Sequence, residues 1–355
     1  MQNILLRFGY KHDMNAVLPV SGNYVGRYKP FHRAALVGTP WEAAGLEYDL
    51  YCLHGIWNFA QVDKLLGYEA RYFSILRDPV ELFISLWDYA SLDKLYHCSL
   101  EEYAFANKTH GRFKDRIHMS NLGRNQMLFD LGLPRHQLNE VEAVEKKIEE
   151  AEQTFDLIML SERFDESLVL LKHLLCWDYS DLTSLKLNHR KQESKSVISD
   201  EAREALKEWL WGDYMLYDHF AAKFERELTE LGSDAFLEKE LGKLAAENAK
   251  VVKRCVAQEG VDNKELKGEY HLWGQDMLGY KMKEGEECKL YGIAENPFLD
   301  LYRKSQGARA REVLKSQGRE APQVFDMKKL NPLSFRLSDG TIDIEALKKI
   351  YASPK

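Results

Sequence analysis

The sequence predicts an α/β fold in which a parallel sheet is flanked by helices. Two segments carry this prediction, residues 71–76 (RYFSIL) and 155–160 (FDLIML), because both are short and rich in β-forming residues. A helix is expected directly after the first, from Pro79, and another after the second, over about 165–177. Strand, tight turn and helix in this order typify α/β units, which bind ligands where strands end and helices begin.

The other elements are expected from amphipathic periodicity. Residues 1–10 are expected to be helical, residues 20–47 to form loops with short helical pieces, and residues 50–53 to form a short strand. Two long amphipathic helices are predicted at residues 200–231 and 236–252. Helices should therefore dominate the second half of the chain.

Composition describes an ordinary globular chain. The 355 residues are 45% hydrophobic and 30% charged, which suffices for a sizeable buried core. The formal net charge of −7 excludes a global attraction to nucleic acid, but it permits a local basic pocket for an anionic cofactor. No run of 18 apolar residues is present and the first residues lack a secretory pattern, which alone would favour the cytosol.

The most informative segment covers residues 76–89 (LRDPVELFISLWDY). Arg77 is expected at the end of a strand, just before a helix that Asp78 caps and Pro79 begins. Ser85 lies two turns into this helix. A guanidinium, a hydroxyl donor and the positive end of a helix are thereby offered to one anion. The alternative is that Arg77 pairs with a carboxylate and Ser85 only packs.

This segment resembles the element that binds the 3′-phosphate of PAPS (3′-phosphoadenosine 5′-phosphosulfate) in sulfotransferases. Other segments resemble the galactose-3-O-sulfotransferases, the family that includes galactosylceramide sulfotransferase. These segments are residues 3–12 (NILLRFGYKH), 123–132 (GRNQMLFDLG), 161–177 (SERFDESLVLLKHLLCW), 186–190 (KLNHR) and 213–224 (DYMLYDHFAAKF). The resemblance covers roughly residues 1–305, the expected sulfotransferase domain, and leaves residues 306–355 as a polar tail of unknown role. From about Gly307 we expect loose packing.

The resemblance implies a P-loop-type PAPS sulfotransferase fold and the transfer of a sulfuryl group from PAPS to the 3-hydroxyl of a terminal galactose. No metal is implied, and no D-x-D or H-E-x-x-H motif is present. The acceptor would be a galactosylceramide-type glycolipid or a glycan, on the lumenal side of the Golgi membrane. The family's first strand, its 5′-phosphosulfate loop and its membrane anchor should precede Asn3, so we expect them to be missing from this chain, which would be inactive and poorly soluble alone.

The resemblance also assigns individual residues. Arg77 and Ser85 would bind the 3′-phosphate. His54, in a His-Gly context after a short strand, would be the base that takes the proton of the sugar hydroxyl. The alternative for His54 is a structural histidine bonded to the backbone. Arg190 and Lys191 would reach the nucleotide phosphates, unless they form a solvated basic pair.

Three further residues, Arg124, Asn125 and Gln126, would line the acceptor groove, with an exposed helix surface as the alternative. Two other functions stay open. One is the uronyl 2-O-sulfotransferase branch, which residues 161–177 argue against. The other is a non-catalytic galactoside-binding remnant, which the expected loss of the loop motivates.

The five cysteines lack a CxxC pair, which argues against a zinc ribbon. Their odd number and wide spacing fit a reduced cytosolic protein, or a lumenal protein with one or two bridges. The family resemblance implies a disulfide between Cys255 and Cys288. Asn107 begins a glycosylation sequon with Lys108 and Thr109, a signal that also occurs often by chance.

Overall fold

The structure, a computed structural model, describes residues 1–26, 29–67, 69–109, 123–187, 189–191, 195–274 and 276–322, without the side chains of residues 106–109. It divides into two compact units. Unit 1 comprises Met1–Ala70 and Ile293–Lys355, and unit 2 comprises Arg71–Gly292. Across the described ranges, no helix is both long and apolar enough to cross a membrane.

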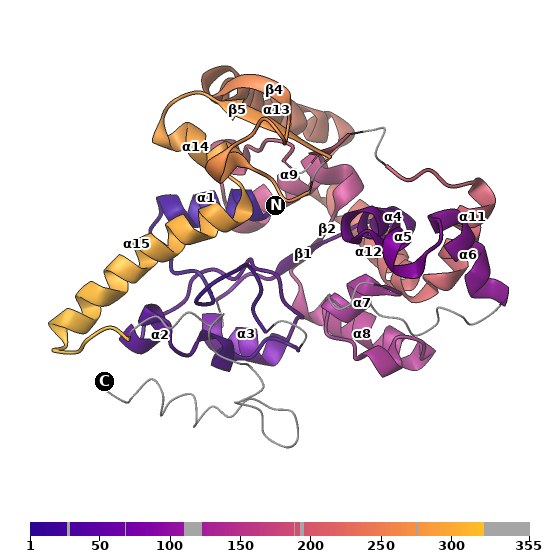
Figure 1. Ribbon diagram of the computed structural model, residues 1–355, viewed down its shortest axis with the longest axis horizontal. Helices are drawn as coiled ribbons and strands as arrows, with labels where there is room; N and C mark the ends of the chain where they lie inside the picture. The colour runs from indigo at the N-terminus through magenta and orange to yellow at the C-terminus, as the bar shows by residue number, and fades with distance from the viewer. Residues whose placement is uncertain are drawn as a thin grey trace. The chain divides into compact units, whose positions relative to one another are not determined.

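Unit 2 contains the predicted parallel strands. β1 (Phe73–Leu76) pairs with β2 (Leu157–Leu160), in register from Phe73 opposite Leu157 to Leu76 opposite Leu160 (Figure 1). α4 (Pro79–Ala90) follows β1, and α9 (Phe164–Leu175) follows β2 after a 3-10 turn. A mixed α/β fold with a small parallel sheet is therefore confirmed. Two strands do not define a P-loop strand order, so that finer expectation stays a prediction.

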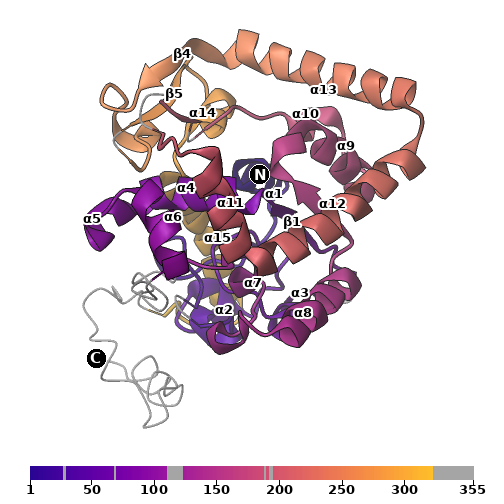
Figure 2. The same cartoon turned by 90° about the vertical axis from the view of Figure 1, so that its right-hand side faces the viewer.

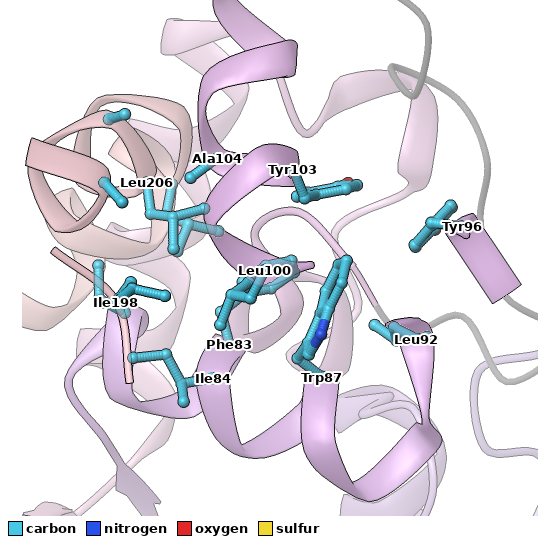
Figure 3. Packing of buried hydrophobic residues seen from close by; sticks show 14 residues of the cluster. Phe83, Ile84, Trp87, Leu92, Tyr96, Leu100, Tyr103, Ala104, Ile198 and Leu206 are labelled. Carbon is cyan, nitrogen blue, oxygen red and sulfur yellow. The ribbon is translucent and has the colours of Figure 1, made fainter. Parts of the chain in front are cut away.

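The inner face of α4 packs into an aromatic cluster with α5 (Leu92–Tyr96), α6 (Leu100–Thr109) and α11 (Asp200–Trp209). Phe83 and Trp87 of α4 lie beside Tyr103 (Figure 3). Their ring centroids are 5.8 and 4.9 Å from that of Tyr103. Rings at such distances and inclinations contribute about 0.5–1.5 kcal/mol per pair beyond their area burial. The cluster fixes the rotation of α4 and thereby decides which residues its outer face presents.

The rest of unit 2 is built around long helices. α12 (Trp211–Leu231) leads into α13 (Asp234–Cys255), which runs to the antiparallel strands β4 (Val256–Asp262) and β5 (Met277–Met282) (Figure 2). The short β3 (His189–Arg190) pairs with β5 on its other side. The remaining helices are α7 (Gln126–Asp130), α8 (Val141–Thr154), α10 (Tyr179–Leu182) and α14 (Glu286–Gly292).

The strands β4 and β5 were not predicted from the sequence. Four successive residues of β4, from Ala257 to Gly260, are exposed, so the strand shows no alternation of buried apolar and exposed polar residues. A disulfide joins Cys255 at the end of α13 to Cys288 in α14, which is the pairing that the resemblance implied. Together with Val251 and Tyr291 it forms a small buried cluster.

Unit 1 consists of short helices and irregular chain. Its helical elements are α1 (Gln2–Lys11), η1 (Arg33–Leu36), α2 (Pro40–Ala44), α3 (Phe59–Leu66) and α15 (Glu295–Ser316), with α15 alongside α1 and α2 (Figure 1). The predicted strand at 50–53 is wrong. Three isolated parallel bridges, at Leu50, His54 and Ile56, replace it. The partner segment contains prolines and glycines, which interrupt a continuous ladder.

The expectation of loose packing from Gly307 is also wrong as far as Ser316. α15 continues through this region and buries Gly307, Ala310 and Leu314, which recur every three or four residues and so share one face. Gln306, fully buried, donates to the carbonyl of Ala16 and accepts from its amide at 3.0 and 2.9 Å. The boundary placed at residue 305 therefore falls inside a helix, while the separate tail beyond residue 322 lies outside the described residues.

Candidate functional site

Arg77 and Ser85 occupy the strand–turn–helix of unit 2. Arg77 directly follows β1, and Asp78 caps α4 by accepting a hydrogen bond from the Glu81 amide at 2.9 Å. Pro79 takes the first helical position, as predicted. The first turn of α4 thereby directs the positive end of the helix towards the turn that carries Arg77.

The side chains of Arg77 and Ser85 are half-buried and have no partner among the described residues. In the described part of the chain, neither side chain makes a hydrogen bond, and Arg77 makes no ion pair. The predicted alternative, in which Arg77 pairs with a carboxylate, is therefore not what the described residues show. A guanidinium offers five N–H donors, so an unengaged one at a helix N-terminus is suited to bind an oxyanion.

Groups from α12 and from the end of β2 hold the turn in place. The Tyr214 hydroxyl donates to Oδ2 of Asp78 at 3.1 Å, and the Asp78 amide donates to Oε1 of Glu162 at 2.9 Å. Tyr217 in turn donates to Glu162 at 3.4 Å. Burial and the Asp78 carboxylate raise the pKa of Tyr214, so its hydroxyl remains a donor. These contacts join the segments 161–177 and 213–224 to the Arg-Asp-Pro turn.

Ser85 shares a polar stripe of α4 with Glu81 and Asp88, because these residues are spaced by four and three positions. Each carboxylate is paired with an arginine. Nη1 of Arg203 lies 2.6 Å from Oε1 of Glu81, and Nη1 of Arg190 lies 3.0 Å from Oδ2 of Asp88. Ser85 is therefore positioned between two arginine–carboxylate pairs, and the structure brings Arg190 to the helix that carries Ser85.

Lys191 lies next to Arg190 but pairs elsewhere, with Asp262 of β4, while its amide donates to the Asp276 carbonyl at 2.9 Å. Asp88 also accepts from the Ser196 amide at 3.1 Å, which fixes the segment after β3 on α4. The alternative of a solvated basic pair does not describe Arg190 and Lys191, since both are ion-paired. Sequence reasoning missed Asp88, although its position one turn after Ser85 was visible.

A pocket of about 280 Å³ lies beside the first turn of α4. Charged and aromatic side chains line it, among them Asp78, Glu81, Arg203, Lys207 and Tyr214. Small-molecule sites commonly measure about 300–1,000 Å³, so this hollow accommodates part of a ligand rather than a whole nucleotide.

Arg124, Asn125 and Gln126 bond within the protein. Arg124 donates to the Trp209 carbonyl at 2.7 Å, and fully buried Asn125 donates to the Leu138 carbonyl at 2.9 Å. Gln126, also buried, accepts from the Gly123 amide at 3.0 Å. An exposed helix surface, the alternative considered for them, is not what they form. Acceptor binding by these residues stays a prediction.

Asp213 is a buried carboxylate that sequence reasoning did not single out. It accepts hydrogen bonds from the amides of Met127 and Leu128 at 3.1 and 3.0 Å and so caps α7. Burial raises its pKa to about 7, although these backbone bonds act in the opposite direction. Its contacts are scaffold contacts, since they join α12 to α7.

His54 lies in unit 1 and is half exposed, with 49% of its side-chain surface accessible. Its ring stacks on Tyr24 at a centroid distance of 5.1 Å, and its Nε2 lies 3.1 Å from Oε1 of Glu295 at the start of α15. Its backbone is fixed on both sides, by the Asn23 carbonyl and the Val25 amide. Only the fold brings Glu295 to His54, so no sequence signal could have found this carboxylate.

The last predicted site residue is Asn107, which begins the glycosylation sequon. Asn107 lies near the end of α6, and its side chain is outside the described part of the structure, so glycosylation stays a prediction. Within the described ranges, no group of three or more His, Cys, Asp or Glu side chains is placed to hold a metal ion.

Comparison with known proteins identifies relatives over most of the chain. The family profile described as galactose-3-O-sulfotransferase matches residues 1–296. The chain is 32% identical to galactose-3-O-sulfotransferase 2 of Sus scrofa over 293 residues, covering 80% of this chain and 73% of the relative. It is 29% identical to galactose-3-O-sulfotransferase 2 of Mus musculus over 82% of this chain and 77% of the relative. It is 29% identical to galactosylceramide sulfotransferase of Bos taurus, with 79% and 68% covered. No solved structure matches significantly.

Proposed function

Because the chain belongs to the galactose-3-O-sulfotransferase family, we propose that it transfers a sulfuryl group from PAPS to the 3-hydroxyl of a terminal galactose. The acceptor we propose is a galactosylceramide-type glycolipid or a galactose-capped glycan. The names of the relatives support this acceptor class, since they refer to galactose and to galactosylceramide.

The observation that carries the proposal is that the side chains of Arg77 and Ser85, on one strand–turn–helix, have no partner among the described residues. An anion that accepts from both side chains would be stabilised by these charge-assisted and neutral hydrogen bonds, and the positive end of α4 adds to its stabilisation. A phosphate fits this donor set, because its oxygens match the fork of a guanidinium. Arg190 supports the same assignment, since its pairing with Asp88 uses only part of its donor capacity.

PAPS, when bound, would supply the sulfuryl group that the 3-oxygen of galactose accepts, with 3′-phosphoadenosine 5′-phosphate as the leaving group. In unit 2, Arg77 and Ser85 bind the 3′-phosphate and Arg190 adds charge. In unit 1, His54 receives the proton of the galactose hydroxyl. Positioning and electrostatic stabilisation supply most of the rate, as in phosphoryl transfer.

We further propose that β1 and β2 belong to a P-loop-type sheet and that the protein works in the Golgi lumen. The parallel pairing and the ligand groups after both strands support the first point. The disulfide between Cys255 and Cys288 supports the second, because disulfides persist in oxidising compartments.

The test is an assay with sulfur-35-labelled PAPS and three acceptors: galactosylceramide, N-acetyllactosamine, and a β-galactoside methylated at its 3-hydroxyl. We expect label on at least one of the first two acceptors and none on the methylated galactoside. Label on the methylated galactoside, or on a uronic-acid polymer instead, would contradict the proposed regiochemistry. Binding of galactosides without any transfer would identify the protein as a lectin-like member of the family.

A further inference from the structure

We propose that Glu295 is a positioning residue for His54: its carboxylate fixes the imidazole and stabilises the positive charge that the imidazole gains on accepting a proton. This inference rests on the proposed sulfotransferase function, which does not by itself assign a role to Glu295. Both groups belong to unit 1, where Nε2 of His54 and Oε1 of Glu295 are 3.1 Å apart.

The environment of Glu295 indicates that its charge is directed at the imidazole. Oε1 is a buried atom, and Nε2 of His54 faces it at 3.1 Å. A buried carboxylate is costly, and the cost falls when the facing imidazole becomes positive. Burial acts to raise the pKa of Glu295, yet the contacts with His54, Gln2 and Asn23 outweigh it and leave the pKa below its ordinary value. Glu295 is therefore charged at neutral pH.

The position of the carboxylate also selects the atom that works as the base. A carboxylate facing Nε2 favours the tautomer that carries its proton there, which places the lone pair on Nδ1. The stacked Tyr24 ring restricts rotation of the imidazole, and the backbone bonds on both sides of His54 hold its segment. The proton of the galactose hydroxyl then moves to Nδ1, and the imidazolium formed is stabilised by the neighbouring charge. The arrangement is analogous to the carboxylate that orients the histidine of a catalytic triad.

Other titratable groups near the pair are few in the described part of unit 1. Tyr24 stacks on the ring of His54. The Cys52 thiol lies near Glu295 and the Met1 amine. Burial, and to a smaller extent the charge of Glu295, raise the pKa of this thiol to about 12, so it stays neutral. Burial and Arg7 lower the pKa of the Met1 amine. Glu295 is thus a charged group that faces the imidazole directly.

The experiment compares Glu295→Gln and Glu295→Asp with Glu312→Gln, which makes the same chemical change at an exposed position of the same helix. We expect Glu295→Gln to lower kcat at least about tenfold, with KM for donor and acceptor changed less than about twofold. The acid limb of the pH–rate profile should move to lower pH, because the imidazolium loses its counter-charge. Glu295→Asp should restore part of the rate, and Glu312→Gln should behave as wild type.

A readout independent of turnover is the NMR titration of the His54 imidazole, assigned by its loss in His54→Gln. Its midpoint should fall in Glu295→Gln and stay in place in Glu312→Gln. An active wild type whose Glu295→Gln variant keeps the same acid limb and the same His54 midpoint would overturn the inference while leaving the proposed function intact. A wild type that sulfates no galactoside would instead remove the function, and with it the catalytic meaning of the pair. Should Glu295→Gln melt early, Glu295→Asp and the titration still decide.

Discussion

The two candidate sites are built in opposite ways. In unit 2, Arg77 and Ser85 lie eight positions apart on one strand–turn–helix, and a buried aromatic cluster packs against its helix. In unit 1, His54 lies in irregular chain secured by isolated bridges, and its carboxylate partner comes from a helix near the other end of the sequence. The contrast separates the proposed anion site, which a local motif can encode, from the proposed site of proton transfer, which depends on tertiary assembly.

The strongest test of this contrast is His54→Ala. If His54 is the base, turnover should fall by roughly 10²–10⁴-fold while the affinity for 3′-phosphoadenosine 5′-phosphate, measured by calorimetry, stays within about twofold. His12→Ala, at an exposed position after α1 in the same unit, is the control. A combined loss of melting temperature, affinity and turnover would show a structural histidine instead, and a stable, fully active variant would refute both interpretations.

The pH dependence of the free energy of unfolding tests the buried carboxylate of Asp213 in unit 2, separately from the chemistry proposed for His54 in unit 1. Burial raises the pKa of Asp213 to about 7, above its value in an unfolded chain. Between about pH 4 and 7 the folded state therefore holds a proton that the unfolded state releases, and its stabilising contribution is lost as pH rises. Relative to Asp213→Asn, the wild-type free energy of unfolding should fall by up to roughly 4 kcal/mol over this window. Urea denaturation at pH 4, 5.5 and 7.5 measures it; a difference that is constant with pH would disprove the shift.

Arg77→Ala should weaken binding of 3′-phosphoadenosine 5′-phosphate by about 1.5–3 kcal/mol, or roughly 10–150-fold. The loss has a direct cause, since the guanidinium is the unengaged donor at the helix end. Arg71→Ala is the matched control, because Arg71 is exposed before β1 and pairs with Asp156 at 3.2 Å. Unchanged calorimetric affinity for Arg77→Ala would remove the main support for the anion site.

Ser85→Ala should cost less, about 1 kcal/mol of the same affinity, because a neutral hydroxyl contributes one ordinary hydrogen bond. The double variant with Arg77→Ala sharpens the comparison. If both side chains hold one phosphate, the two losses should not add, and the coupling energy should be measurable by a double-mutant cycle. Strict additivity would place them in separate interactions.

The elements predicted correctly from the sequence are those with strong local signals. The strand before Arg77 and the helix that Asp78 and Pro79 begin follow from propensity and capping, which act over a few residues. The strand predicted at residues 50–53 does not form, because a strand also requires a partner strand. Here proline and glycine interrupt the partner segment. The β4–β5 hairpin was missed because its charged, exposed surface carries no hydrophobic alternation.

The same division applies to the sites. Arg77, Ser85 and His54 were singled out from motifs, whereas the contacts that give them a chemical setting join distant segments. Asp88 with Arg190 and His54 with Glu295 are examples. Asn125, also singled out from a motif, is fully buried and bonded to a backbone carbonyl, and its predicted role in acceptor binding stays a prediction. Polarity alone does not separate a ligand contact from an internal brace.

The disulfide between Cys255 and Cys288 encloses the entire β4–β5 hairpin in a covalent ring. A protease that cuts the chain once inside this ring leaves one molecule, because both new ends remain tethered to α13 and α14. The strand β3, which carries Arg190, pairs with β5 of this hairpin. Reduction would convert the same nick into a complete break between the two halves of the chain. In an oxidising compartment, the protein should therefore tolerate a cut in this region.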